Sequence, residues 1–143
     1  MHTLSGGCHC GALQVTASLS GPPKDYRPRE CDCDFCRKHA AAYISDPRGS
    51  LRIAIGGERA LTRYRQGSAL AEMLLCRNCG VLVAAVYQDE RVLYGVVNAR
   101  ILEQWPDFGA AQVVSPRTLS ADQKVSRWRG LWFRDVNIGN LSS

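Results

Sequence analysis

The seven cysteines of this chain fall into three short groups, and metal binding is the simplest explanation for such clustering. A Cys-x-x-Cys turn can direct two sulfur atoms at one ion. A Cys-x-Cys in extended chain can do the same, because residues i and i+2 project from one side. Buried structural cysteines would be scattered instead, and disulfides are rare in a reducing compartment. The groups are Cys8-His9-Cys10, Cys31-Asp32-Cys33-Asp34-Phe35-Cys36 and Cys76-Arg77-Asn78-Cys79.

An odd number of cysteines has a chemical meaning if the ligands divide as four plus three. Four thiolates around zinc make a closed structural site, whereas three leave a position for water or substrate, as in catalytic sites. Three thiolates give a zinc site a net charge of about −1, which weakens it as a Lewis acid and favours a soft sulfur ligand. The sequence therefore predicts two zinc ions per chain, of which the second is open to a thiol and could be labile.

Spacing alone permits two divisions of these ligands. The first joins Cys8 and Cys10 with Cys76 and Cys79, and leaves Cys31, Cys33 and Cys36 as the open site. The rival joins Cys33 and Cys36 with Cys76 and Cys79, as in a zinc ribbon, and leaves Cys8, Cys10 and Cys31. We favour the first, because Gly11 and Gly80 make the outer groups a matched pair of knuckles in which backbone N–H groups can point at sulfur. It also keeps the open-site ligands contiguous.

Polar side chains in and beside the middle group are candidates for substrate contacts. Arg37 and Lys38 could attract the carboxylates of a substrate, although a solvated basic pair would have the same pattern. His39 could complete the metal site or carry a proton, or it could be an ordinary surface histidine. Asp32 and Asp34 could orient a bound water, and solvated loop positions are the simpler interpretation.

Short strands are the elements that must position these groups. Apolar and polar residues alternate over 12–19, which is the period of a half-buried strand, and the apolar run 81–87 predicts a central strand. Further strands are expected at 41–45, 51–55, 61–65, 69–75 and 91–98. Residues 35–41 could form a short helix, and Ser120 opens a second with a Ser-x-x-Gln capping box. We therefore predict one mostly-β domain over residues 1–143, with short helices.

The C-terminal third is rich in aromatic residues. Trp105, Trp128 and Trp132 could line a pocket, but packing in the core or a satellite cluster is the better expectation near a chain end. Residues 127–134 interleave basic and aromatic side chains, as a stacking platform for single-stranded nucleic acid would. The other basic residues are spread along the chain, so nucleic acid is not the expected partner. We expect the tail after Arg134 to be loosely ordered.

Length and composition exclude several classes of protein. With 143 residues, 45% hydrophobic and 22% charged, the chain is neither fibrous nor disordered. No run reaches the roughly 18 apolar residues of a membrane span, and the N-terminus lacks the features of a signal peptide, so a cytoplasmic protein is expected. The formal charge of +5 suggests an anionic partner, but seven bound thiolates and two zinc ions would reduce it to about +2.

Three motifs stand in a recognisable order along the chain. They are Gly6-Gly7-Cys8-His9-Cys10-Gly11-Ala12-Leu13, Cys31-x-Cys33-x-x-Cys36-Arg37-Lys38 and Leu75-Cys76-x-x-Cys79-Gly80. Over about residues 5–105 this pattern resembles the glutathione-dependent formaldehyde-activating enzyme family, which includes centromere-protein-V-like zinc domains. The resemblance implies a β-tent fold, a structural zinc on Cys8, Cys10, Cys76 and Cys79, and a second zinc on Cys31, Cys33 and Cys36. Asp32 departs from the pattern, because the family often has histidine there.

The resemblance also implies a reaction between a small thiol and an aldehyde. Addition of glutathione to formaldehyde gives S-hydroxymethylglutathione, and the reverse step breaks a carbon–sulfur bond, as a carbon–sulfur lyase does. An incoming thiol would lose its proton at the open zinc and be held as a nucleophile, with Arg37 and Lys38 as substrate contacts. The alternative is a zinc-stabilised protein- or nucleic-acid-binding module without catalytic activity, in which His39 or another side chain closes the second site. A thiol sensor that oxidises and releases zinc is a third hypothesis.

Overall fold

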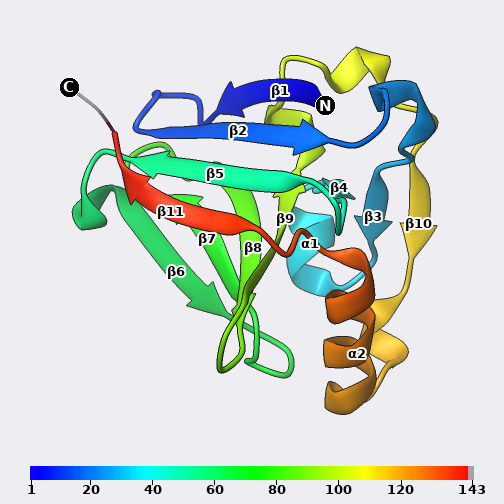
Figure 1. The fold of residues 1–143 in the computed structure, drawn as a ribbon. Helices are drawn as coiled ribbons and strands as arrows, with labels where there is room; N and C mark the ends of the chain where they lie inside the picture. The colour runs from blue at the N-terminus through cyan, green and yellow to red at the C-terminus, as the bar shows by residue number, and fades with distance from the viewer. Residues whose placement is uncertain (142–143) are drawn as a thin grey trace.

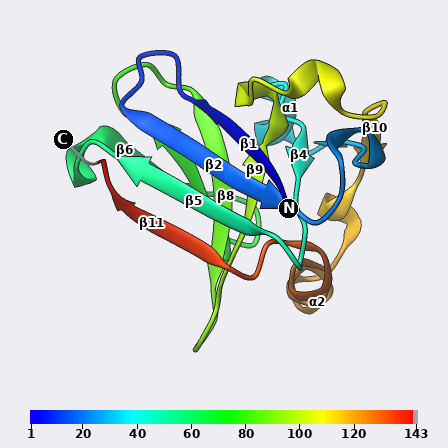
Figure 2. The ribbon, with the colours of Figure 1, turned by 45° about the horizontal axis from the view of Figure 1, so that its top comes forward.

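The computed structural model describes residues 1–141, and most of its regular structure is β-strand in two sheets (Figure 1). The four-stranded sheet contains β1 (His2–Gly7), β2 (Leu13–Leu19), β5 (Ser50–Ile55) and β11 (Val136–Asn140), in the order β1-β2-β5-β11. The seven-stranded sheet contains β3 (Arg29–Cys31), β4 (Tyr43–Ile44), β6 (Leu61–Arg65), β7 (Glu72–Cys76), β8 (Leu82–Gln88), β9 (Leu93–Asn98) and β10 (Gln112–Val114). Its order is β10-β3-β4-β9-β8-β7-β6. In Figure 2 the strands of the first sheet run across β8 and β9 of the second.

Helices are short, which confirms the expected mostly-β fold. Within residues 1–141 the α-helices are α1 (Asp34–Lys38) and α2 (Ala121–Leu131). The single 3₁₀ turns are η1 (Pro23–Asp25), η2 (Glu58–Ala60), η3 (Ala99–Ile101), η4 (Trp105–Asp107) and η5 (Pro116–Thr118). No helix in this part of the chain is both long enough and apolar enough to cross a membrane.

Helix α2 begins at the predicted capping box but is longer than expected. The Ser120 hydroxyl accepts from the Gln123 N–H at 3.2 Å, and the Gln123 side chain accepts from the Ser120 N–H at 2.8 Å. The sequence favoured one or two turns before Gly130, whereas the helix has 11 residues and continues past that glycine. Trp128 on the helix and Trp132 just after it are buried against the seven-stranded sheet, and this packing outweighs the low helix propensity of glycine.

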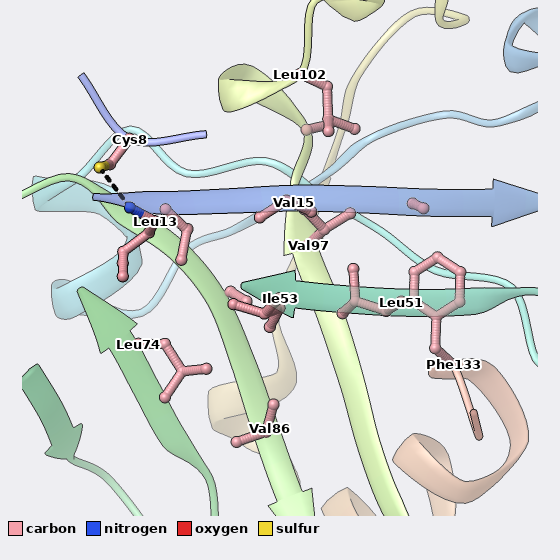
Figure 3. Packing of buried hydrophobic residues seen from close by; sticks show 14 of the residues in the cluster. Cys8, Leu13, Val15, Leu51, Ile53, Leu74, Val86, Val97, Leu102 and Phe133 are labelled. Carbon is pink, nitrogen blue, oxygen red and sulfur yellow. Dashed lines mark hydrogen bonds between the residues drawn. The ribbon is translucent and has the colours of Figure 1, made fainter. Parts of the chain in front are cut away.

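The core lies between the two sheets and follows the periodicities seen in the sequence. In β2 the apolar residues are buried and the polar residues between them are exposed or partly exposed, as predicted for a half-buried strand. Strand β8 lies between β7 and β9, and its first five residues are buried, which confirms the predicted central strand. Figure 3 shows Val15 and Ile53 from one sheet packed with Leu74, Val86 and Val97 from the other.

The expectation of a loosely ordered tail after Arg134 is wrong for residues 135–141, and its last two residues lie outside the described part of the chain. Strand β11 pairs in parallel with β5, from Val136 opposite Leu51 to Asn140 opposite Ile55. Fully buried Phe133 anchors the segment, because its N–H and carbonyl both exchange hydrogen bonds with Gly95, at 2.9 and 3.0 Å. Residues 136–140 are ordered because their backbone groups pair with β5 at the edge of a sheet, which a short polar stretch does not reveal in sequence.

Asp46, in a turn between β4 and β5, forms a buried polar hub. Its side chain accepts hydrogen bonds from the Ser20 N–H at 2.8 Å, the Ser20 hydroxyl at 2.6 Å and the Tyr26 hydroxyl at 2.7 Å. The Arg48 N–H donates a further bond of 2.9 Å. Burial alone would raise the pKa of this carboxyl, but the hydrogen bonds outweigh it and lower the pKa to about 2. The hub ties the loop after β2 to the turn that leads into β5.

Candidate metal centres and the adjoining cavity

Four cysteines from distant parts of the chain meet at one end of the core. Cys8 and Cys10 follow β1, Cys76 ends β7 and Cys79 follows it, and the four sulfur atoms lie within 4.8 Å of one another. The Cys8 and Cys10 sulfurs are 3.7 Å apart, and those of Cys10 and Cys76 are 3.5 Å apart. Zinc–sulfur bonds of about 2.3 Å in a tetrahedron place the sulfurs about 3.8 Å apart. The donor set therefore fits a closed zinc site.

Glycine turns and backbone N–H groups hold these sulfurs in place. Gly11 and Gly80 have φ of +86° and +79°, in the left-handed region that strains other residues. The turns bring the Leu13 N–H to 3.2 Å from the Cys8 sulfur (Figure 3) and the Cys79 N–H to 3.4 Å from the Cys76 sulfur. Such donors stabilise thiolates and orient them toward a metal. The knuckle geometry thus follows the prediction, although the donors are neighbours of the glycines.

The three middle cysteines form a second, smaller cluster. Cys31 ends β3, Cys33 caps α1 and Cys36 lies within it, and their sulfurs fall within 4.8 Å of one another. Hydrogen bonding from Cys36 lowers the pKa of Cys31 to about 6, and the same bond raises the pKa of Cys36. No histidine, aspartate or glutamate among residues 1–141 joins the cluster. The cysteines thus group as four plus three in the favoured division, and the zinc-ribbon grouping does not occur.

A cavity of about 250 Å³ opens beside the three-cysteine cluster, and Cys31, Cys33 and Cys36 form part of its wall. Its apolar lining comprises Ala71, Met73, Ala85, Val96, Val114, Pro116, Trp128 and Trp132. Its cationic lining comprises Arg29, Arg117, Lys124 and Arg127, and its other residues are Tyr43, Gln66, Gly67 and Ser68. Among these described lining residues none is acidic. The cavity is therefore a largely apolar space with cationic side chains and the three cysteines in its wall.

Two residues that the sequence analysis did not single out line the cavity and lie near the cysteine cluster. The Tyr43 hydroxyl lies 3.2 Å from the Cys36 sulfur, and the Gln66 amide nitrogen lies 4.0 Å from the Cys33 sulfur. Burial raises the pKa of Tyr43, so that it remains a neutral phenol able to donate a hydrogen bond. Tyr43 falls within a predicted strand, but only its burial beside α1 identifies it as part of the site.

The polar residues predicted around the middle group lie outside this cavity. Arg37 forms an exposed ion pair of 3.0 Å with Asp34 and borders a second cavity, which shares Cys31 and Cys36 with the first. Lys38 borders neither of these two cavities. His39 is exposed, and its ring centre lies 4.6 Å from that of Phe35.

Asp32 holds the chain after β10 against the cluster. Its carboxylate accepts from the Ser115 hydroxyl at 2.6 Å and from Arg117 at 3.1 Å. The hydrogen bond from Ser115, followed by the charge of Arg117, lowers the pKa of Asp32. Asp32 borders the second cavity, so the structure places it as a positioning contact rather than in the first cavity.

The basic and aromatic segment near the C-terminus does not offer a stacking platform. Trp128 and Trp132 are each 7% exposed, and their rings stack on one another with centres 4.8 Å apart. Phe133 is fully buried. The two tryptophans pack in the core, as expected, and also line the cavity. Trp105 lies elsewhere, under the guanidinium of Arg100 at 4.6 Å.

Arg29 gives the cavity an unusual electrostatic character. Its guanidinium donates to the neutral Ser45 hydroxyl at 2.8 Å, and that hydroxyl donates to the Leu131 carbonyl at 2.7 Å. Burial, followed by the positive charge of Arg127, lowers the pKa of Arg29 to about 10. Strand β3 and helix α2 therefore place two cations near each other on the cavity wall.

Comparison with known proteins agrees with this arrangement. A crystal structure of a Rhodobacter sphaeroides protein is 32% identical, with a TM-score of 0.55, and the match covers 77% of this chain and 99% of that one. The family model described as glutathione-dependent formaldehyde-activating enzyme matches residues 3–117, somewhat beyond the expected 5–105. The matched region contains all seven cysteines and ends before α2. The chain belongs to the glutathione-dependent formaldehyde-activating enzyme family.

Proposed function

We propose that this protein is a zinc-dependent carbon–sulfur lyase that acts on glutathione or a related thiol adduct of a small aldehyde. One observation carries the proposal. Three cysteines share a cavity wall, and among residues 1–141 no histidine, further cysteine, aspartate or glutamate joins them as a fourth ligand, whereas the separate cluster has four cysteines. Three protein ligands are typical of catalytic zinc, and four of structural zinc. Membership of the family supports chemistry between a thiol and formaldehyde.

The two clusters have different roles in this proposal. Cys8, Cys10, Cys76 and Cys79 hold a structural zinc, and Cys31, Cys33 and Cys36 hold the second ion. Zinc bound by three thiolates supplies an open position for a soft sulfur ligand and lowers the pKa of a thiol that occupies it. The four-cysteine site ties the segment after β1 to the β7–β8 turn, so its loss is expected to destabilise the fold.

The reaction needs a positioned thiolate and a proton donor. In the synthetic direction the sulfur forms a bond to the carbonyl carbon, the π electrons move to oxygen, and the oxygen takes a proton equivalent to the one the thiol lost. The reverse direction breaks the same carbon–sulfur bond. The neutral Tyr43 hydroxyl orients a cluster sulfur from 3.2 Å, and the apolar wall of Met73 and Trp128 excludes water that would compete with the thiol.

The non-catalytic binding module receives less support. That hypothesis expects His39 or another side chain to close the second site, yet His39 lies against Phe35 and outside the cluster. It also relies on the aromatic residues of 127–134 as a contact surface, and Trp128, Trp132 and Phe133 are buried. The first observation argues against a second site closed by His39, and the second argues against residues 127–134 as a nucleic-acid contact surface.

The proposal is tested by metal content and turnover of the purified, zinc-loaded protein. We expect two zinc ions per chain and faster exchange between free glutathione, formaldehyde and S-hydroxymethylglutathione, measured by NMR exchange spectroscopy. Cys31→Ser should leave one tightly held zinc, preserve the fold and abolish the added exchange. Cys10→Ser is the matched control, because it removes a cysteine from the other cluster. Its main effect should be a lower free energy of unfolding.

Two outcomes would contradict the proposal. One zinc per chain, with Cys31, Cys33 and Cys36 all open to alkylation in the native protein, would show that the middle cluster is not a metal site. Exchange that is unchanged in Cys31→Ser would separate the activity from this cluster. Tight binding of a nucleic acid that weakens steeply with salt, without any exchange activity, would favour the binding module.

A further inference from the structure

Apart from the three cysteines, the charged side chains that line the cavity are all cationic. Arg29, Arg117, Lys124 and Arg127 line it, and among its described lining residues none is acidic. Arg117 is neutralised by Asp32 at 3.1 Å, on the side of the second cavity. By contrast, neither Arg29, Lys124 nor Arg127 takes part in an ion pair within residues 1–141. The remaining positive charge faces the space where a substrate would bind.

Arg29 and Arg127 are the two cations best placed to act together. Arg29 is half-buried and held by the neutral Ser45 hydroxyl at 2.8 Å, so its position is set without neutralising its charge. Arg127 is half-buried on α2 and close enough to Arg29 to act on it electrostatically. Two neighbouring guanidinium groups without a carboxylate are unfavourable unless an anion joins them, and guanidinium groups bind carboxylates through paired hydrogen bonds.

The rest of the lining favours an apolar group. Trp128 and Trp132 stack on each other, and with Met73 and Val96 they form a wall of aromatic and aliphatic side chains. The volume of about 250 Å³ is below the roughly 300–1,000 Å³ of sites for drug-sized ligands. A ligand that fills this space is therefore small and largely apolar, apart from the group that meets the arginines.

Glutathione meets these conditions only in part. It carries an ammonium group and two carboxylates on a polar peptide backbone, and no acidic side chain among the described lining residues would pair with the ammonium. An ammonium placed among arginines is repelled and loses hydration. The cavity thus disfavours a ligand with a cationic end.

We propose that the cavity selects a thiol adduct with an apolar body and one carboxylate, with Arg29 and Arg127 binding the carboxylate and Trp128 and Trp132 the body. This inference rests on the proposed lyase function and narrows its substrate. Arg127, Trp128 and Trp132 lie beyond residues 3–117, so selectivity comes from the segment that follows the family match. Of the four residues proposed to bind the ligand, Arg29 is the one that lies within the family match.

The test measures binding of probes that contain neither thiol nor aldehyde, so that its result does not depend on turnover. The zinc-loaded, full-length protein is titrated with 3-phenylpropionate and with its neutral isostere 3-phenylpropanamide. Quenching of tryptophan fluorescence reports binding, because two of the three tryptophans line the cavity. We expect the carboxylate to bind about tenfold more tightly than the amide, and propionate, which lacks the ring, to bind about tenfold more weakly than 3-phenylpropionate.

Charge-matched variants identify the arginine responsible. Arg127→Gln should weaken binding of 3-phenylpropionate about tenfold and leave that of the amide unchanged. Arg129→Gln removes the same charge from the same helix, but Arg129 points to Asp89 at 3.6 Å and does not line the cavity, so it should change neither. The comparison of acid with amide on the unaltered protein decides the proposal even if a variant folds poorly.

Several results would overturn the inference. Equal affinity for acid and amide would show that no carboxylate site exists, and equal effects of Arg127→Gln and Arg129→Gln would show only long-range electrostatics. Carboxylate binding that is unchanged in Arg127→Gln would show that Arg127 does not bind the anion and would refute the proposed arginine pair. Tighter binding of phenyl phosphate would assign the site to phosphate, and displacement of the probe by low glutathione concentrations would refute the exclusion of glutathione. None of these outcomes bears on whether Cys31→Ser abolishes exchange.

Discussion

Replacing Asp46 with asparagine removes a stabilising charge from the interior. We expect it to lower the free energy of unfolding by an amount that depends on pH. Three hydrogen bonds, two from Ser20 and one from Tyr26, converge on one carboxylate oxygen at 2.6 to 2.8 Å. An asparagine amide cannot accept all three with the strength of a carboxylate. The Ser20 and Tyr26 donors would then have weaker hydrogen bonds, or none, beside a buried side chain.

The magnitude follows from the pKa of Asp46. Lowering it from 3.8 to about 2 corresponds to about 2 kcal/mol of unfolding free energy, because each tenfold change in the equilibrium is worth about 1.4 kcal/mol. The folded-state pKa lies below the unfolded value, so this contribution is complete above about pH 5 and is lost as the pH falls through about 2. Asp46→Asn should therefore be less stable by at least about 2 kcal/mol at pH 7, and the gap should narrow by that amount near pH 2.

The assay is urea unfolding of both proteins at matched pH, together with NMR titration of the Asp46 carboxyl carbon. Comparison at the same pH cancels the loss of thiolate-bound metal in acid, which affects both proteins. Asp25→Asn, an exposed change on the loop that carries Ser20 and Tyr26, should stay within about 0.5 kcal/mol of the unaltered protein. An Asp46 titration midpoint at or above 3.8, or a stability gap that is constant from pH 7 to pH 2, would refute the reasoning.

Three further substitutions test other parts of the fold, each by urea unfolding. Phe133→Ala should lower the unfolding free energy by about 3–5 kcal/mol, since Phe133 is fully buried between the sheets, whereas Val113→Ala at a 68% exposed position should change it by less than about 0.5 kcal/mol. Ser120→Ala should cost about 1 kcal/mol through loss of the capping box, and an unchanged midpoint would show that α2 is held by packing alone. Gly80→Ala should cost about 1–2 kcal/mol from its φ of +79° alone, because no atom lies within 4 Å of the added methyl; a larger loss would mean that the knuckle is disturbed.

The cysteine clusters could be predicted because their information is local. Cys-x-Cys and Cys-x-x-Cys spacing brings sulfurs together within a few residues, and the glycines after Cys10 and Cys79 identify the two knuckles that pair across the fold. Strand β8 could be predicted for a similar reason, since a long apolar run with no polar face must be buried on both sides.

The cavity could not be predicted, because its walls come from distant segments. Arg29 and Arg127 are separated by about two thirds of the chain, and neither lies in a pattern that points to the other. Strands β3 and β10 have only three residues each, which is too short for a period of two to be recognised. Asp46 lies in a turn, where an aspartate is ordinary, and only its three-dimensional contacts reveal a buried hub.

The family match ends within η5, before α2, and this boundary separates the sulfur ligands from part of the cavity wall. All seven cysteines lie before this boundary, whereas Lys124, Arg127, Trp128 and Trp132 lie after it. Exchange of the C-terminal segment could therefore alter which molecules enter the site while leaving every sulfur ligand in place. Substrate range in such a scaffold could diversify by replacement of its last helix, and engineering of a new specificity would begin with residues 121–132.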